Sequence, residues 1–442
     1  MFSMLLSMAV LGSPVPGYLA YPTASTHLLQ MDVRSRLLGI HSSFQEAYKQ
    51  KHYVEAAALG LYAMDLGEKQ PDALYNTACA LSLSGDRERA FKVLDKASRF
   101  GFTDFNLIST DSDLVSLHSD LRWSPLLSRI EKAAESRHRR LSDPSRVEFV
   151  TSDIPRFWAA YDKAIANPAD KREAIFQHEY LDRATPGMQD WIRVRKVTAR
   201  TLTQFVNKSP KFYASARDAT LQIATQRPAT LEAFQKFKTL YPQAEFPNVA
   251  FSVGAFYGGG TVSNANLLMS AEMYSLSPKT SKDELGRWQK LVLTPTSDIP
   301  FIVAHEMIHF QQRYTQSDQT LLAACIEEGA ANFLGSMCSG GVGEFHQLNV
   351  YPYGDVHEKE LWERFQKDMD RTDKQSVWLY SESGEGVRPD DLGYYMGHRI
   401  CESYYKNASD KTQAIYDILN IKDFKSFLAK SRYSDKFTGL NK

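Results

Sequence analysis

The most informative segment of this 442-residue chain is Ile299–Tyr314, IPFIVAHEMIHFQQRY. Ile302, Val303 and Ile308 supply the apolar side chains that a buried helix requires. His305 and His309 stand four residues apart, so both imidazoles lie on one face of that helix and can reach the same cation. Glu306 projects from the neighbouring face, where a carboxylate can accept a proton from metal-bound water. This HExxH pattern indicates a metal-dependent hydrolase.

A third ligand follows at a defined spacing. Residues 310–327 form an eighteen-residue gap, and Glu328 comes next, in the segment CIEEGAANFLG. A second helix that carries Glu328 back to the first would complete a His2Glu set and leave one position for water or substrate, as in catalytic zinc sites. Glu327 is the alternative ligand, although the spacing and the following Gly329 favour Glu328. The other interpretation of the whole pattern is a pair of charged helices without a metal.

HExxH, eighteen residues and then Glu followed by Gly-x-Ala resemble the gluzincin zinc peptidases. In the aminopeptidase N type of that class, an Asn-Glu-Gly-x-Ala segment supplies the third ligand, and Glu327 stands here in place of the Asn. The resemblance implies one catalytic Zn2+ ion on His305, His309 and Glu328. It also implies that Glu306 is the general base.

The region from about residue 150 to 430 is also similar to a bacterial family of predicted zinc-dependent proteases, classified as a domain of unknown function. The similar segments, in chain order, are IPRFWAAYDKA, EYLDRATPGMQDWI, a glycine-rich hairpin, HEMIHFQQ, EEGAANF and LGYYMGHRICESYY. This similarity implies a zincin-type metallopeptidase domain over residues 150–442.

The last of these segments contains candidates for a further catalytic group. His398 is four residues from Tyr394 and three from Tyr395, so a helix places the side chains near one another. Gluzincins need a hydrogen-bond donor that faces the oxyanion of the tetrahedral intermediate. The resemblance implies that Tyr394, Tyr395 and His398 include this donor. Ordinary packing is the alternative in a chain with 22 tyrosines. In either case Gly393 and Gly397 predict a close approach to another helix.

Residues 155–245 are predicted to be mainly helical, because apolar residues recur at three- and four-residue spacing. The next segment has the composition of two strands, VAFSVGAFY and ANLLMSAEMY, joined by a turn at Gly258–Gly260. The glycines lack a lysine and a P-loop pattern, so phosphate binding is not favoured. The strand around Asn264–Ser270 is expected beside the cleft, where an extended peptide could pair with it. The fold class is therefore mainly α with a small β-sheet (α+β).

Residues 36–135 are predicted to form helices with an internal repeat, because Ala56 and Ala63 recur 34 residues later as Ala90 and Ala97. The segment YNTACALSLSGDRERAFKVLDKASRFGF resembles a tetratricopeptide repeat. Its small residues and packing leucines are Ala78, Leu81, Ala90, Leu94 and Ala97. The resemblance implies a short helical platform for a protein partner; a plain pair of helical hairpins is the alternative. The charged segment at residues 131–146 is expected to link the two halves.

Residues 1–28 are predicted to be a signal peptide or a disordered leader. Phe2–Leu11 is apolar and precedes small residues and prolines, as in a signal peptide core, although no Lys or Arg stands before it. A secreted or periplasmic location is therefore expected, with a cytoplasmic one as the alternative. No other segment approaches the ~20 apolar residues of a membrane-spanning helix.

Charge and cysteine content exclude several classes of protein. The 52 basic residues equal the 52 acidic ones, so nucleic acid is not an expected partner. Four cysteines lie far apart without a CxxC pair, which argues against a zinc ribbon and a disulfide-rich scaffold. Of these, Cys325 and Cys338 are expected to be buried apolar residues.

These features predict zinc-dependent hydrolysis of a peptide or protein substrate. Endopeptidase action is favoured over aminopeptidase action, because no GAMEN-like motif is present to hold a free amino terminus. One alternative is an inactive peptidase-like protein that acts as a binding module through the helices of residues 36–135. The other is a zinc amidase or esterase, because the same activated water attacks any activated carbonyl.

Overall fold

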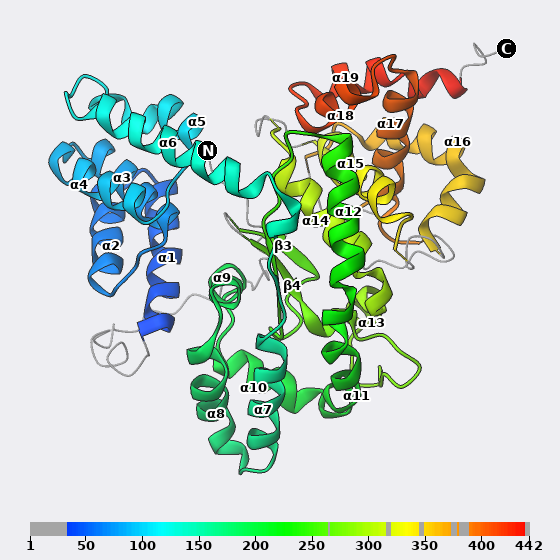
Figure 1. Ribbon diagram of the computed structural model, residues 1–442, viewed down its shortest axis with the longest axis horizontal. Coiled ribbons are helices and arrows are strands. Elements are labelled where there is room, and N and C mark those ends of the chain that lie inside the picture. The colour runs from blue at the N-terminus through cyan, green and yellow to red at the C-terminus, as the bar shows by residue number, and fades with distance from the viewer. Residues whose placement is uncertain are drawn as a thin grey trace, which may run out of the picture. The chain divides into compact units, whose positions relative to one another are not determined.

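The computed structural model describes residues 33–263, 266–314, 320–343, 349–372, 378–379 and 389–437. The leader expected over residues 1–28 lies outside the described residues. The chain divides into two compact units, residues 1–140 and residues 141–442 (Figure 1). None of the described helices combines the length and the apolar character that a membrane-spanning helix requires.

The first unit consists of helices that pack on one another in chain order. They are α1 (Val33–Lys49), α2 (Tyr53–Asp65), α3 (Pro71–Leu83), α4 (Arg87–Arg99), α5 (Phe105–Thr110) and α6 (Trp123–Leu141). α1 packs on α2, α2 on α3, and α3 on α4. Ala56, Ala90 and Ala97 are fully buried between them, where short side chains let helix axes approach closely. The predicted helices and their buried alanines are confirmed.

The charged segment at residues 131–146 contains the boundary between the two units, as expected of a link between the halves, and it is largely helical. α6 continues through its first residues and ends at Leu141. Between residue 131 and Pro144 the sequence contains neither Gly nor Pro, so nothing interrupts the helix that starts at Trp123. The division between the two units therefore falls at the end of a helix.

The second unit contains a small sheet in its described residues. Its strands are β1 (Phe149–Val150), β2 (Asn248–Ser252), β3 (Gly260–Val262) and β4 (Asn266–Ser270), in the order β1-β2-β4-β3. β1, β2 and β4 are parallel, and β3 is antiparallel to β4 at the edge. Together with the many helices, this confirms a mainly α chain with a small β-sheet.

Two expectations about these strands were wrong. β2 and β4 do not form a hairpin; they pair in parallel, with Val249 opposite Leu267, and the hairpin joins β3 to β4. β4 is also an interior strand, and the edge strand beside it is β3. β2 and β4 are buried at four of five positions each, and such continuous apolar runs are typical of interior parallel strands covered on both faces.

The other described elements of the second unit are mainly helices. They are α7 (Asp153–Ile165), α8 (Arg172–Glu179), α9 (Pro186–Arg195), α10 (Ala199–Lys208), α11 (Pro210–Leu221), α12 (Arg227–Leu240), α13 (Arg287–Val292), α14 (Ile299–Gln311), α15 (Leu321–Ser339), α16 (Tyr351–Asp368), α17 (Leu392–Asn407), α18 (Lys411–Leu419) and α19 (Phe424–Ser431). α14 packs on β3 on one side and on α15 on the other, and α15 packs on α17. This arrangement places the HExxH helix between the edge strand and the helix that carries Glu328.

α15 and α17 are in backbone contact where two glycines meet. A Cβ atom on Gly397 would lie 1.7 Å from the carbonyl oxygen of Cys325, and one on Gly329 would lie 2.1 Å from the carbonyl carbon of Gly397. The predicted close approach of the helix that carries Gly393 and Gly397 is confirmed. Cys325 and Cys338 are buried, as expected, and so are Cys79 and Cys401.

Gly397→Ala is expected to destabilise the second unit. Alanine favours a helix over glycine by about 1 kcal/mol, but the added methyl group would collide with backbone atoms that have no rotamer with which to avoid it. Overpacking of a close core contact costs about 1–3 kcal/mol or more, so we expect a lower midpoint in urea. Gly341→Ala is the matched control, because a Cβ there meets nothing within 4 Å; equal midpoints for the two variants would contradict the prediction.

Candidate metal centre

α14 presents two imidazoles from successive turns of one helix. The Nε2 atoms of His305 and His309 lie 3.0 Å apart, and their rings are nearly perpendicular. Ile299, Val303 and Ile308 are fully buried and anchor the helix in the core. The two histidines remain partly accessible, as a site that admits a ligand requires.

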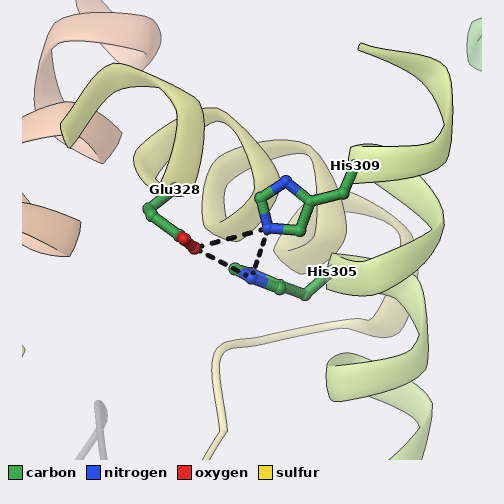
Figure 2. A group of neighbouring side chains, drawn as sticks. All are labelled: His305, His309 and Glu328. Carbon is green, nitrogen blue, oxygen red and sulfur yellow. Dashed lines mark hydrogen bonds and ion pairs between the residues drawn. The ribbon is translucent and has the colours of Figure 1, made fainter. Parts of the chain in front are cut away.

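Glu328 reaches this pair from α15. Its Oε2 atom lies 3.3 Å from the Nε2 atom of His305 and 3.3 Å from that of His309, so the three atoms form a compact triangle (Figure 2). The side chain of Glu327 is exposed instead, and it is not a member of the group. The carboxylate that joins the histidines is therefore that of Glu328.

The three donor atoms have the separations that a single small ion requires. Zinc bonds of about 2.0–2.1 Å at tetrahedral angles place neighbouring donors about 3.3 Å apart. Two imidazole nitrogens and one carboxylate oxygen are also the ligand types of many catalytic zinc sites. The residues present therefore fit a zinc ion, and three protein ligands leave a tetrahedral ion one further position.

Amide oxygens hold the other nitrogen of each imidazole. The Nδ1 atom of His305 lies 2.9 Å from Oδ1 of Asn332, and the Nδ1 atom of His309 lies 2.7 Å from Oε1 of Gln312. An amide oxygen can only accept, so each Nδ1 carries the proton and donates. In the neutral imidazoles, this tautomer leaves the lone pair of Nε2 on the side of Glu328, where a shared metal ion would bind.

Without an ion, the cluster is an ion pair. Burial alone would lower the pKa of His309, but the negative charge of Glu328 outweighs it and raises that pKa to about 10. Burial also opposes the ionisation of Glu328, yet the charge of His309 holds the pKa of Glu328 well below its usual range. An incoming cation must therefore displace a proton from His309.

Glu306 lies on the side of α14 that faces β3. A Cβ atom on Gly260 would lie 2.5 Å from Oε1 of Glu306, so the carboxylate rests against the bare Cα of the edge strand. Two side chains hold this glycine segment: Arg195 donates from Nη2 to the carbonyl of Gly260, and the Tyr274 hydroxyl donates to that of Gly259, both at 2.8 Å. Of the glycines predicted to be a turn, Gly260 is thus the one required where Glu306 packs.

The structure separates the three candidate oxyanion donors. The ring of Tyr394 lies 6.2 Å from that of His305, centroid to centroid. Tyr395 is on another face of α17, fully buried, with its hydroxyl 2.9 Å from Oδ1 of Asp355. His398 is buried, and its Nδ1 atom lies 2.5 Å from the hydroxyl of Tyr351. Among the three, Tyr394 is the one whose ring packs beside an imidazole of the centre.

The second unit is the part of the chain that matches a known family. The model of a family described as gliding motility protein GldB matches residues 141–435. The chain belongs to the GldB family. Its matched region contains β1–β4 and the complete His305, His309 and Glu328 group. The chain matches no curated protein and no solved structure.

The GldB match corrects the expected family. Membership of the gluzincin peptidases, or of the bacterial family of predicted zinc-dependent proteases, was wrong, because most of the second unit matches GldB instead. HExxH is a five-residue pattern that places two imidazoles and a carboxylate on one helix. Such a pattern can occur on more than one fold, so it indicates chemistry better than ancestry.

Several residues around the centre were missed in the sequence. Asn332 follows Glu328 by four residues, so the helical spacing that predicts the ligand pair also places Asn332 on the same face of α15. Gln312 follows His309 by three residues and could have been found in the same way. Arg195 had no signal at all, because α9 is more than 100 residues away from α14 in sequence.

Asn332→Ala is expected to weaken zinc binding by about 10- to 100-fold, the usual loss when a residue that orients a metal-binding histidine is removed. Titration against a chromophoric chelator would measure the affinity. Asn332→Asp keeps an acceptor at the same distance and should retain tighter binding than Asn332→Ala. Equal affinities for the two variants would show that the bond to His305 does not matter.

Gly260→Ala is expected to reduce any Glu306-dependent hydrolysis by about 10²-fold, the loss typical of a 1 Å misplacement of a catalytic group. The added methyl would displace the carboxylate of Glu306 but leave the three ligands in place. Gly259→Ala is the matched control, because a Cβ there has ordinary contacts of 3.6 Å or longer. Turnover rates with equal zinc content would test the difference.

Proposed function

We propose that the second unit is a zinc-dependent hydrolase that cleaves peptide bonds, with internal bonds of a peptide or protein as its substrate. The observation that carries the proposal is the triangle of donor atoms at 3.0 and 3.3 Å from His305, His309 and Glu328. A structural metal site has four protein ligands, whereas a catalytic one has three and an open position. The accessible carboxylate of Glu306 beside this group favours catalysis over a purely structural site.

The chain's own residues supply the remaining parts of a hydrolytic centre. When bound, zinc supplies Lewis acidity and lowers the pKa of a water molecule. Glu306 accepts the proton of the attacking water and returns it to the departing amine. Tyr394, whose ring lies beside His305, donates a hydrogen bond to the oxyanion that forms on the scissile carbonyl.

β3 offers a place for the peptide backbone. Residues 259 and 263 use their main-chain groups to bond β4, and in an antiparallel pair the intervening residues Gly260 and Val262 direct theirs outward. An extended peptide added at this edge would run past Glu306. The carbonyl of Gly260 already accepts a hydrogen bond from Arg195, so Val262 is the main-chain partner that remains for it.

The proposal is tested by metal analysis and a cleavage assay on the full-length protein. One zinc ion per chain and cleavage of a peptide library, both lost with a chelator and recovered with zinc, are the expected results. Cleavage of ester or simple amide substrates alone would select the amidase or esterase alternative. A zinc-loaded protein that cleaves nothing in these assays would overturn the proposal.

A second candidate is a binding role in gliding motility at the cell envelope, which the name of the matched family favours. The helices of the first unit would then contact a protein partner. Complementation decides between the candidates: in a gliding host that lacks the gene, a Glu306→Gln protein that restores movement would select binding over hydrolysis. The same strain, fractionated, would test the proposed location outside the cytoplasm.

A further inference from the structure

Arg195 lies beside the candidate centre without a carboxylate partner. It is the last residue of α9, and its guanidinium lies over the ring of Trp191 at 5.4 Å from the centroid. Its Nη2 atom donates to the carbonyl of Gly260 at 2.8 Å, while its Nε atom is buried without a hydrogen bond. Within the described part of the chain, no Asp or Glu lies at ion-pair distance from it.

Gly260 connects this arginine to the catalytic carboxylate. One side of the glycine holds the guanidinium through its carbonyl, and its Cα lies against Glu306. Arg195 and Glu306, the side chain proposed to activate water, therefore both contact Gly260. Burial lowers the pKa of Arg195 and the negative charge of Glu306 opposes that effect, which agrees with a half-buried charge close to the centre.

A nearby arginine has the usual arrangement. Arg193 stands two residues earlier on α9 and pairs with Asp190, with 3.5 Å between Nη2 and Oδ1. A half-buried cation without such a partner is costly unless another charge meets it. Glu306 acts on Arg195 only from beyond ion-pair distance. In the zinc-loaded centre, Glu306 and Glu328 would together offset the two charges of the ion, so neither would be left to balance the charge of Arg195.

We propose that Arg195 binds a carboxylate of the peptide substrate at the edge of β3, so that the centre prefers substrates with an acidic group near the scissile bond. This inference rests on the proposed hydrolytic function. A guanidinium presents paired N–H donors in a fixed plane and matches a carboxylate with two bonds. The carboxylate can belong to an Asp or Glu side chain or to the carboxyl terminus of the peptide.

Binding, rather than turnover, tests this role. The probes are heptapeptide mixtures matched in length: one contains Asp and Glu, the other has Asn and Gln in their places, and each is made with a free or an amidated carboxyl terminus. Equilibrium dialysis against zinc-loaded full-length Glu306→Gln protein, read by mass spectrometry, gives the retention of each mixture. The chain has equal numbers of acidic and basic residues, so general attraction of acidic peptides is not expected.

Peptides with a carboxylate are expected to bind about 10- to 100-fold more tightly than their neutral counterparts, the range for a hydrogen-bonded charged pair. The preference should disappear when Arg195→Gln is added, persist in part with Arg195→Lys, and be unaffected by Arg193→Gln. Loss of the preference on amidation alone identifies the carboxyl terminus, and loss on exchange of Asp and Glu alone identifies the side chain.

Two outcomes overturn the inference: no preference for carboxylates in the protein with Arg195 intact, or a preference that survives in folded Arg195→Gln. The intact-protein comparison needs no variant at this position, so it decides even if Arg195→Gln fails to fold. Failure of the two proposals is distinguishable. Arg195-dependent binding without any hydrolysis by the wild-type protein removes only the proposed function, and hydrolysis that ignores carboxylates removes only the role of Arg195.

Discussion

Glu306→Gln is expected to lower peptide hydrolysis by about 10²- to 10⁴-fold, the contribution of a positioned general acid–base, while the protein keeps one zinc ion per chain. The amide has nearly the shape of the carboxylate and still packs against Gly260, but it cannot accept the proton of the attacking water. The zinc ligands on α14 and α15 are unchanged. Single-turnover rates and metal analysis of the same preparation would measure both properties.

Glu327→Gln provides the control for this experiment. It makes the same change of charge on an exposed side chain next to Glu328, and we expect little effect on rate. A Glu306→Gln protein with wild-type rates would remove the general-base assignment. Loss of zinc in that variant would instead indicate that Glu306 helps to hold the ion.

Glu328→Ala is expected to abolish stoichiometric zinc binding, with a loss larger than the 10- to 100-fold expected for a residue that only orients a ligand. The variant removes one of three donors and also the negative charge that offsets the ion. His305→Ala should behave in the same way. Calorimetric titration with zinc, alongside metal content after dialysis, would measure the losses.

Glu327→Ala is the matched comparison for the third ligand, because it is the neighbouring carboxylate on the same helix. It should retain zinc, since its side chain is outside the donor triangle. Full zinc content in Glu328→Ala together with loss in Glu327→Ala would reverse the assignment of the third ligand. Full zinc content in both His305→Ala and Glu328→Ala would show that the zinc is bound elsewhere. The His–Glu cluster would then be an ion pair without a metal.

Local periodicity accounts for the part of the centre that could be predicted. The i, i+4 spacing of His305 and His309 is a property of any α-helix, and the apolar residues around them identify the helix without reference to the rest of the chain. Glu328 could be chosen over Glu327 only by analogy of spacing. The geometry that distinguishes them, two 3.3 Å contacts against an exposed side chain, depends on how α15 packs against α14.

The strands illustrate the opposite case. Composition located β2 and β4, because short runs of apolar residues are visible in the sequence. It did not predict that β2 and β4 are parallel. It also did not predict that β3, which lies between them in sequence, is an edge strand of the sheet. Strand order depends on hydrogen bonds between distant segments, which leave no periodic signal in either segment.

The HExxH segment by itself therefore determined a helix with two imidazoles on one face, a carboxylate beside them, and the class of ion that such donors suit. The bond between His309 and Gln312 is also local, because the two residues are three positions apart. Tertiary structure alone decided that Glu328 rather than Glu327 completes the group, that Asn332 contacts His305, and that Gly260 brings Arg195 next to Glu306. The physical reason is the separation in sequence between the groups that interact. Helical spacing is set by backbone bonds four residues apart, whereas these contacts join elements through side-chain packing over distances in sequence that no local pattern encodes.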